Sequence, residues 1–122
     1  MDMHFEGVIF NTYADELARR LGHAFPPFAV LDVRPRADHD KRRIRGSISI
    51  DPEHLESLPS GTNETTEMFV VGADHVDPAV RTAALALKRL GARRVVEVTG
   101  GYYEWRRRGL PEGSGQASNS NS

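Results

Sequence analysis

The sequence predicts an α/β domain with a central parallel sheet of about five strands that helices cover on both faces. Three observations support this fold class. Short apolar runs alternate along the 122-residue chain with segments of helical periodicity. The runs at 28–33 and 68–71 are almost continuously apolar, as in strands that are buried on both faces. The length suits a single domain with its own hydrophobic core.

Each predicted element follows from its local pattern. The predicted strands, which are apolar runs, are Val8–Phe10, Phe28–Val33, a short stretch within Ile44–Ile50, Met68–Val71 and Arg94–Val98. The predicted helices, which repeat apolar residues at helical spacing, are Tyr13–Leu21, a brief helix from Pro52 to Leu58, Pro78–Leu90 and Tyr102–Arg108. Thr12 is the expected N-cap of the first helix. The segment 36–43 is expected to be a polar loop with at most one helical turn, and 59–67 a turn-rich loop.

The segment 68–91 is the part around which the rest of the chain is organised. Gly72 ends its apolar strand, and Asp77 followed by Pro78 is a helix start signal, because the carboxylate can cap free N–H groups. Gly91 closes the helix. The loop after such a strand lies at the carboxyl edge of a parallel sheet, where ligands bind. Residues 72–77 are therefore the first place to look for a functional site.

Composition excludes several kinds of chemistry. The chain has no cysteine, which excludes disulfides, thiolate catalysis, persulfides and iron–sulfur clusters on this chain. No apolar run is long enough to cross a membrane, and the N-terminus lacks the pattern of a signal peptide, so we expect a cytoplasmic protein. The net charge of -1 gives no general attraction to nucleic acid or to an anionic membrane.

Three segments, in their order and spacing, resemble the rhodanese-like family. They are Leu31-Asp32-Val33-Arg34 followed by Ile44-Arg45-Gly46-Ser47, the central strand, loop and helix that end at Leu90-Gly91, and Gly100-Gly101-Tyr102-Tyr103-Glu104-Trp105 followed by Gly109-Leu110-Pro111. The resemblance covers roughly residues 8–112 and implies a rhodanese-like three-layer sandwich. We therefore expect a single rhodanese-like domain over 1–112. The polar stretch 113–122 is expected to be a flexible tail or linker.

The resemblance also implies where an active site would lie and why this one is degenerate. In active members a cysteine opens the loop after the central strand and carries a sulfane sulfur, backbone N–H groups cradle an anion, and an arginine closes the loop. Here the cysteine position falls on Asp74, or on Ala73 with a one-residue insertion, and the arginine position falls on Ala79. Pro78 has no N–H to offer. The degenerate loop comprises Gly72, Ala73, Asp74, His75, Val76, Asp77, Pro78 and Ala79.

Carboxylates in this loop also oppose an anionic substrate. Two unit charges of the same sign ~4 Å apart repel by about 4 kcal/mol at a surface-like effective dielectric. Asp74 and Asp77 therefore disfavour thiosulfate or phosphate at this position. We expect no sulfurtransferase activity and no cofactor.

Three functions stay open. The first is an inactive domain that acts as a protein-binding or regulatory module through the loop surface. The second is an enzyme of another class that uses Asp74 and His75 for acid–base or hydrolytic chemistry. The third is a sulfur-trafficking accessory domain that docks onto a cysteine-bearing partner without carrying sulfur itself.

Other polar clusters are expected to be structural or solvated. His75 with Asp74 and Asp77 has the ligand types of a metal site, but Asp77 is already explained as an N-cap, so no metal is expected. Asp38-His39-Asp40 is expected to be a solvated loop. The basic segments 41–45 and 106–108 are expected to be solvated faces with salt bridges rather than a nucleic-acid site. Asp32 and Arg34, by the resemblance, bridge loops. Trp105 and the adjacent tyrosines Tyr102 and Tyr103 are expected to pack in the core rather than to bind a ligand.

Overall fold

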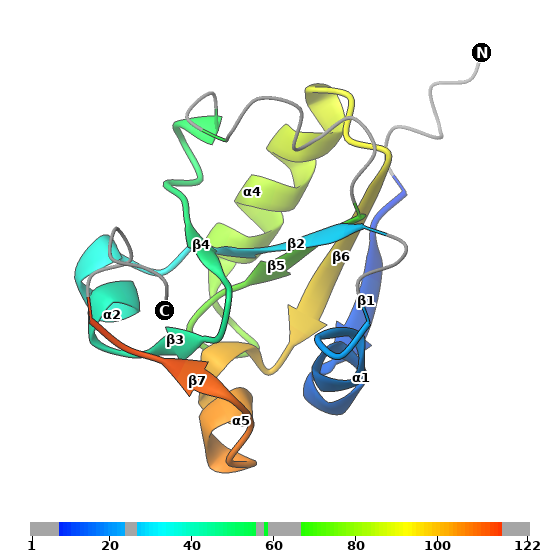
Figure 1. Cartoon of the computed structure of the whole chain (residues 1–122). Coiled ribbons are helices and arrows are strands. Elements are labelled where there is room, and N and C mark those ends of the chain that lie inside the picture. The colour runs from blue at the N-terminus through cyan, green and yellow to red at the C-terminus, as the bar shows by residue number, and fades with distance from the viewer. Residues whose placement is uncertain (1–7, 24–26, 56–57, 59–66, 116–122) are drawn as a thin grey trace.

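A five-stranded parallel sheet forms the centre of the computed structural model, which describes residues 8–23, 27–55, 58 and 67–115. The strand order is β1–β6–β5–β2–β4, and each neighbouring pair is parallel (Figure 1). The five strands are β1 (Phe10–Tyr13), β2 (Phe28–Asp32), β4 (Ile48–Ser49), β5 (Glu67–Val71) and β6 (Arg94–Thr99). A separate antiparallel pair joins β3 (Arg43–Ile44) to β7 (Glu112–Gly113).

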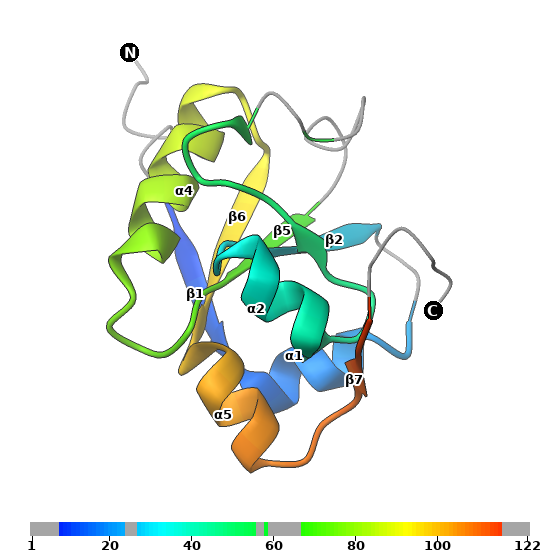
Figure 2. The same ribbon diagram turned by 90° about the vertical axis from the view of Figure 1, so that its left-hand side faces the viewer.

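Helices cover both faces of the sheet. On one face lies α4 (Pro78–Arg89), and on the other lie α1 (Ala14–Arg20) and α5 (Gly101–Arg107), while α2 (Arg36–Lys41) follows β2 (Figures 1 and 2). The alternation of β5 explains the two cores, because Met68 and Val70 face α4 whereas Phe69 and Val71 face α1 and α5. The predicted three-layer α/β fold is confirmed.

Large apolar side chains fix the helices on the sheet. Leu17 of α1, Leu87 of α4 and Trp105 of α5 are completely buried. Burial of an aliphatic or aromatic side chain of this size contributes roughly 1.5–3 kcal/mol. The indole N–H of Trp105 donates to the Pro111 carbonyl at 2.8 Å, which satisfies its one polar atom. The prediction that Trp105 and the adjacent tyrosines belong to the core is confirmed for Trp105 and Tyr102 and is wrong for Tyr103, which is exposed.

The helix α4 begins and ends where the local signals predict. Asp77 is its N-cap and accepts from the Ala79 N–H, and Pro78 is its first residue. Gly91 follows the helix with a φ of 95°, a conformation that favours glycine.

The first strand and its helix start differ from the prediction. The strand is Phe10–Tyr13 rather than Val8–Phe10, and the N-cap of α1 is Tyr13 rather than Thr12, with no side-chain capping bond. The reason is tertiary. The four residues of β1 pair in register with Val96–Thr99 of β6, which holds Thr12 in extended backbone opposite Val98.

The predicted third strand is two strands in different sheets. A turn with Gly46 at a φ of 83° separates β3 from β4, and only β4 joins β2 in the central sheet. The brief helix expected at 52–58 does not begin at Pro52, because residues 52 and 53 form a turn, and residues 56 and 57 lie outside the described part of the chain. Leu55 is buried. Of the loop expected at 59–67, residues 59–66 also lie outside the described part, and Glu67 is the first residue of β5 rather than part of a loop.

The prediction that residues 38–40 form a solvated loop is wrong. They belong to α2, and the side chain of His39 is fully buried. Its Nε2 atom lies 3.1 Å from the Ser47 carbonyl oxygen, to which it donates as the Nε2–H tautomer. Contact with the turn after β3 therefore turns this residue inward.

The ordered chain continues beyond residue 112. Gly113 is the second residue of β7 and pairs with Arg43, whose side chain is 4% exposed. The Arg43 guanidinium donates to the carbonyls of Ser114, Gly115 and His39. The domain boundary expected at 112 thus falls inside a strand. Residues 116–122 lie outside the described part of the chain.

Candidate functional site

The loop 72–77 joins β5 to α4 at the carboxyl edge of the sheet. Gly72 leaves the strand in a buried position, and a Cβ atom there would lie 2.5 Å from Cγ2 of Val80 and 2.7 Å from the Asp77 carboxylate. Glycine is therefore required for the loop to turn back against the first turn of α4.

The start of α5 anchors the same loop from the other side. The N–H groups of Tyr102 and Tyr103 donate to the carbonyls of Gly72 and Ala73, each at 2.9 Å. Gly101 makes this approach possible, because its φ is 59° and a Cβ atom would lie 2.6 Å from the Gly72 carbonyl oxygen. This close approach explains why glycine is needed at the second position of the Gly100-Gly101 pair, which belongs to one of the segments that resemble the rhodanese-like family.

Carboxylates of the loop occupy its own backbone N–H groups. One oxygen of Asp77 accepts from the Ala73 N–H at 2.8 Å and the other accepts from the Ala79 N–H at 3.0 Å. The Asp74 carboxylate accepts from the Val76 N–H at 3.0 Å. Pro78 contributes no N–H. An external anion would have to displace Asp77 before it could use the donors of Ala73 and Ala79.

The other predicted loop residues differ in exposure. His75 and Val76 project to solvent, and Val76 is 67% exposed, whereas Asp74 and Ala79 are half-buried. No hydrogen bond joins Asp74 to His75 within the described part of the chain. Among the same residues no group of histidine and carboxylate side chains has the arrangement of a metal site.

Two hollows flank the loop. The larger, of about 410 Å³, lies between the ends of β2 and β4 and the start of α4, and its lining includes Arg34, Arg36, Asp51 and Asp77. The smaller, of about 240 Å³, is lined by Asp74 and His75 together with Arg81 and Glu97 of the neighbouring elements. Both are open and lined by charges of both signs.

A buried ion pair supports the edge on the β2 side. The carboxylate of Asp32 and the guanidinium of Arg34 are both almost fully buried, and Arg34 Nη2 lies 2.8 Å from Asp32 Oδ2. Arg34 also donates to the Arg42 carbonyl at 2.7 Å and lies over the Tyr102 ring, 4.0 Å from its centroid. It thereby bridges β2, the segment before β3 and α5, as expected for a structural pair.

Contacts that the sequence did not predict complete this edge. The Tyr102 hydroxyl donates to the Glu112 carboxylate at 2.6 Å, and burial, with this contact, raises the pKa of Tyr102. Burial lowers the pKa of His39, against the opposing effect of its bond to Ser47. No local sequence signal predicts either contact, because each joins residues from different elements.

The comparisons with known proteins place the chain in a family. The model of the rhodanese-like domain matches residues 13–108, so the chain belongs to the rhodanese-like domain family. No curated protein matches the chain. Within the described residues, no helix is long and apolar enough to span a membrane.

Solved structures share the fold. The Alr3790 protein from Anabaena sp. is 29% identical, with a TM-score of 0.74 over 88% of this chain and 84% of that chain. The rhodanese-like domain of Alr3790 in solution is 26% identical, with a TM-score of 0.71 over 94% of this chain and 86% of that chain. Thiosulfate sulfurtransferase from Pseudomonas aeruginosa is 22% identical, with a TM-score of 0.78, over 92% of this chain but 21% of its own.

Proposed function

We propose that this chain is a catalytically inactive rhodanese-like domain that acts in the cytoplasm as a protein-binding or regulatory module. One observation carries the proposal. In a chain without cysteine, the carboxylate of Asp77 accepts hydrogen bonds from the N–H groups of Ala73 and Ala79, in the loop where family members are expected to hold an anion.

Both requirements of sulfur transfer are unmet in this loop. The reaction needs a thiolate to take the sulfane sulfur, and the side chain at the expected position is that of Asp74 or, with a one-residue insertion, of Ala73. It also needs N–H donors that are free to hold the anionic donor, and carboxylates already accept from the N–H groups of Ala73, Val76 and Ala79. A thiosulfate at this point would meet the Asp77 carboxylate, with a repulsion of about 4 kcal/mol at ~4 Å and a surface-like dielectric.

The rim of the loop supports a role in binding protein. Val76 is 67% exposed, and Tyr103, whose N–H is held by Ala73, is 63% exposed. Aromatic side chains are enriched where proteins meet, because they bury a large area at a low cost in conformational entropy. A docked partner would cover these two side chains together with His75.

Sulfur transfer to cyanide is the first test, from thiosulfate and separately from mercaptopyruvate. A rhodanese that contains the cysteine serves as the positive control. We expect the rate with this protein to equal the background rate without protein. A rate clearly above that background would contradict the proposal, because it would require a route without a thiol.

Site-specific cross-linking tests the binding role. A photoreactive benzoylphenylalanine at Val76 is expected to cross-link a partner protein, whereas the same probe at Leu85, which is 40% exposed on α4, is expected not to. Identical cross-linking patterns from the two positions would mean that the loop is not the docking surface.

An enzyme of another class is the second candidate. The observation in its favour is the hollow of about 240 Å³ that Asp74 and His75 both line. Asp74→Asn keeps an acceptor for the Val76 N–H and removes the charge. If hydrolysis of ester or phosphoester substrates is seen and is lost in this variant with unchanged stability, acid–base chemistry at Asp74 replaces the binding role.

A sulfur-trafficking role would use the same surface. The domain would then dock onto a cysteine-bearing partner and leave the sulfur on the partner's thiol. This version predicts that the proteins cross-linked from Val76 carry a persulfide, which a persulfide-specific alkylation assay detects.

A further inference from the structure

Two arginine-rich segments that lie far apart in the sequence meet in the structure. One is at β3 and the other is at the end of α5. The Arg45 N–H donates to the Pro111 carbonyl at 3.2 Å, and Arg42 Nε lies 3.0 Å from the Glu112 carboxylate. Glu112 in turn accepts from the Tyr102 hydroxyl of α5. The pairing of β3 with β7 therefore brings the two basic segments to one end of the molecule.

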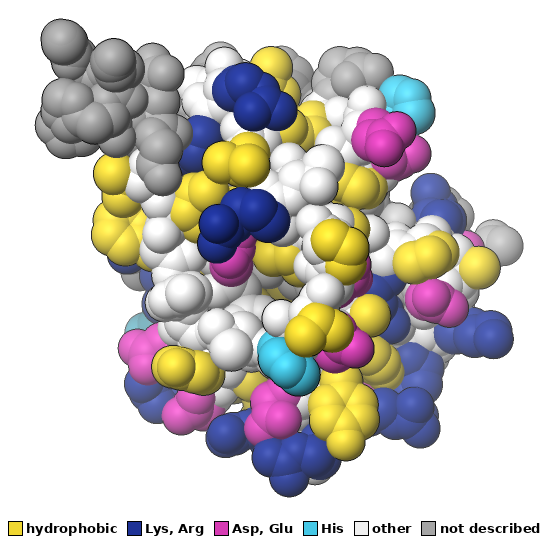
Figure 3. Space-filling model, turned by 180° about the vertical axis from the view of Figure 1, so that it is seen from behind, with side chains coloured by type: hydrophobic (Ala, Val, Ile, Leu, Met, Phe, Trp, Pro, Cys, Tyr) yellow, Lys and Arg dark blue, Asp and Glu magenta, His cyan; other side chains and the backbone are white. Residues whose placement is uncertain are grey.

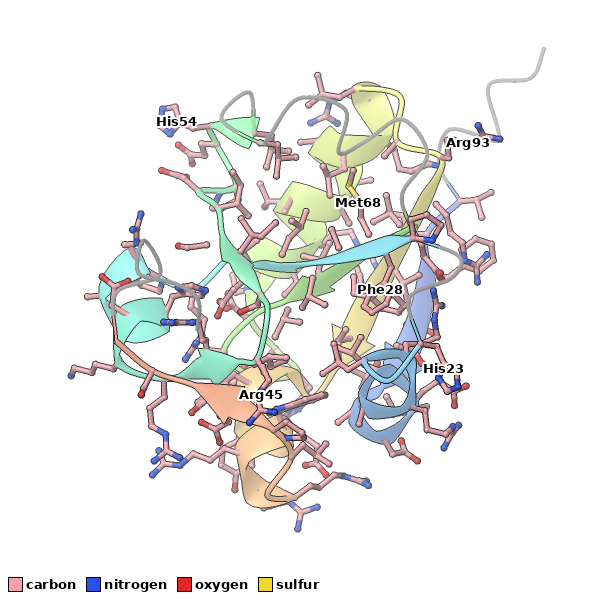
Figure 4. All side chains as sticks on the ribbon, viewed as in Figure 1. His23, Phe28, Arg45, His54, Met68 and Arg93 are labelled. Carbon is pink, nitrogen blue, oxygen red and sulfur yellow. The ribbon has the colours of Figure 1, made fainter. Side chains whose placement is uncertain are left out.

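We define the basic face by its five exposed arginine side chains: Arg42, Arg45, Arg106, Arg107 and Arg108. The guanidinium of Arg43 lies buried beneath it. In Figure 3, Lys and Arg side chains gather at the lower right, the side on which α2 and β3 lie, and around the end of α5, while Figure 4 labels Arg45 beside β3 and β7.

Two carboxylates at this end, Glu104 and Glu112, are already paired with arginines of the face. Glu112 accepts from Arg42 and from the Tyr102 hydroxyl, and its side chain is 12% exposed. Glu104 accepts from Arg107 and Arg108, which lower its pKa to about 2. Arg45 and Arg106 make no ion pair with any residue that the structure describes. The basic face therefore has a local excess of positive charge.

Helix stabilisation explains only part of this charge. Cations in the last turn of a helix interact favourably with its dipole, which accounts for Arg106 and Arg107. Arg42, the C-cap residue of α2, is likewise at a helix end, but Arg45 follows β3 and belongs to no helix, so the dipole does not account for it. The convergence of the two segments thus needs another reason.

We propose that the basic face binds an acidic segment of a protein partner. Guanidinium groups form paired hydrogen bonds with carboxylates, and arginine is enriched at protein interfaces. A hollow of about 340 Å³ opens beside the face and is lined by Lys41, Arg42, Glu112, Gly113 and Ser114, with the Glu112 carboxylate paired to Arg42. This surface is separate from the loop at 72–79 and goes beyond the proposed function.

The charge of the rest of the chain favours a short acidic segment over nucleic acid. The basic face with Arg43 holds six arginines and two glutamates, whereas the remainder of the sequence has ten basic and fifteen acidic residues. Charges are screened beyond about 8–10 Å at physiological salt, so a short segment interacts only with the face. A long duplex, with a charge every ~1.7 Å, extends over the acidic remainder and is repelled there.

Binding of a fluorescent deca-glutamate peptide, followed by anisotropy at low and at physiological salt, tests the proposal. The double variant Arg45→Glu with Arg106→Glu reverses the two unpaired charges of the face. The matched control, Arg89→Glu with Arg93→Glu, makes the same change in net charge at exposed positions, and Arg93 lies at the opposite end of the molecule from Arg45 (Figure 4). Thermal unfolding confirms that both variants are folded.

We expect saturable binding by the wild type, a loss of affinity of about tenfold or more in the face variant, and a change of less than about threefold in the control. If the face variant does not fold, Arg45→Gln with Arg106→Gln replaces it, with a smaller but still selective loss. Equal weakening in both variants, or no saturable binding at low salt, would overturn the proposal. Tighter binding of duplex RNA or of anionic vesicles than of the peptide would also overturn it, in favour of that ligand class.

Discussion

At the scale of single residues, Asp77 links the stability of the fold to the state of the loop. Its two carboxylate oxygens hold the N–H groups of Ala73 and Ala79. Asp77→Ala is expected to lower the free energy of unfolding by about 1–2 kcal/mol, as for other lost N-caps. Urea unfolding measures the change. Asp74→Ala is the control, with an expected loss of about 0.5 kcal/mol, because it frees one exposed donor. Equal losses would mean that Asp77 has no capping role.

His39 gives the stability of the protein a pH dependence. Burial holds its pKa in the folded state below the ordinary 6.5, so the unfolded chain binds this proton at a higher pH than the folded chain. The contribution of neutral His39 to the free energy of unfolding is therefore fully present above about pH 6.5. It is lost as the pH falls below that value, with a slope of up to about 1.4 kcal/mol per pH unit.

His39→Phe removes this titration and provides the comparison. Its free energy of unfolding, measured between about pH 7.5 and 5.5, is expected to vary less with pH than that of the wild type, although its value at neutral pH is lower. Parallel profiles for the two proteins would show that His39 does not titrate differently in the folded and unfolded chains.

At the scale of elements, the contact between α5 and the loop depends on Gly101. Gly101→Ala adds a methyl group 2.6 Å from the Gly72 carbonyl oxygen in addition to the strain of a positive φ. Gly46→Ala has the same kind of φ, 83°, with open space around the new methyl group. We expect a loss of about 1 kcal/mol for Gly46→Ala and a further 1–3 kcal/mol, roughly, for Gly101→Ala.

Thermal and urea unfolding of both variants separate the two contributions. If Gly101→Ala costs no more than Gly46→Ala, the close approach of α5 to the loop is not important for stability. The Gly101→Ala substitution is also expected to increase proteolysis between β5 and α4, because it weakens the contact by which α5 anchors the loop.

Local signals in the sequence predict the elements whose ends are set locally. Asp77 and Pro78 mark the start of α4 because capping and the missing N–H act within a few residues. The limits of β1 could not be found in this way, since its register with β6 determines them. The position of the candidate loop was predictable, but the bond from Asp77 back to the Ala73 N–H was not, because it depends on the path of the loop in space.

Burial of charged residues was the hardest feature to predict. The sequence shows Arg43 within a basic run and His39 between two aspartates, which are patterns of a solvated surface. Arg43 is buried because carbonyls of the C-terminal segment accept its hydrogen bonds, and His39 because of Ser47. Both partners are supplied by the tertiary structure.

At the scale of the whole molecule, the C-terminal segment closes the domain over Arg43. Deletion of 113–122 removes the carbonyls of Ser114 and Gly115 from this guanidinium. We expect a loss of about 1–3 kcal/mol in the free energy of unfolding. Deletion of 116–122 alone is expected to change it by less than about 0.5 kcal/mol, as measured by urea unfolding. Equal losses would place the end of the folded domain beyond residue 115.

The order of strands in the sheet has a consequence for synthesis on the ribosome. Among the described strands, β1 pairs with β6 alone, so that Phe10 lies opposite Val96 and Tyr13 opposite Thr99. Such non-local pairings fold slowly, because a long chain must be closed before the contact forms. During synthesis, β1 and α1 therefore remain without their packing partners until nearly the whole domain has left the exit tunnel. During that time Ala14 and Leu17 of α1, which the folded domain buries, are natural targets for chaperones.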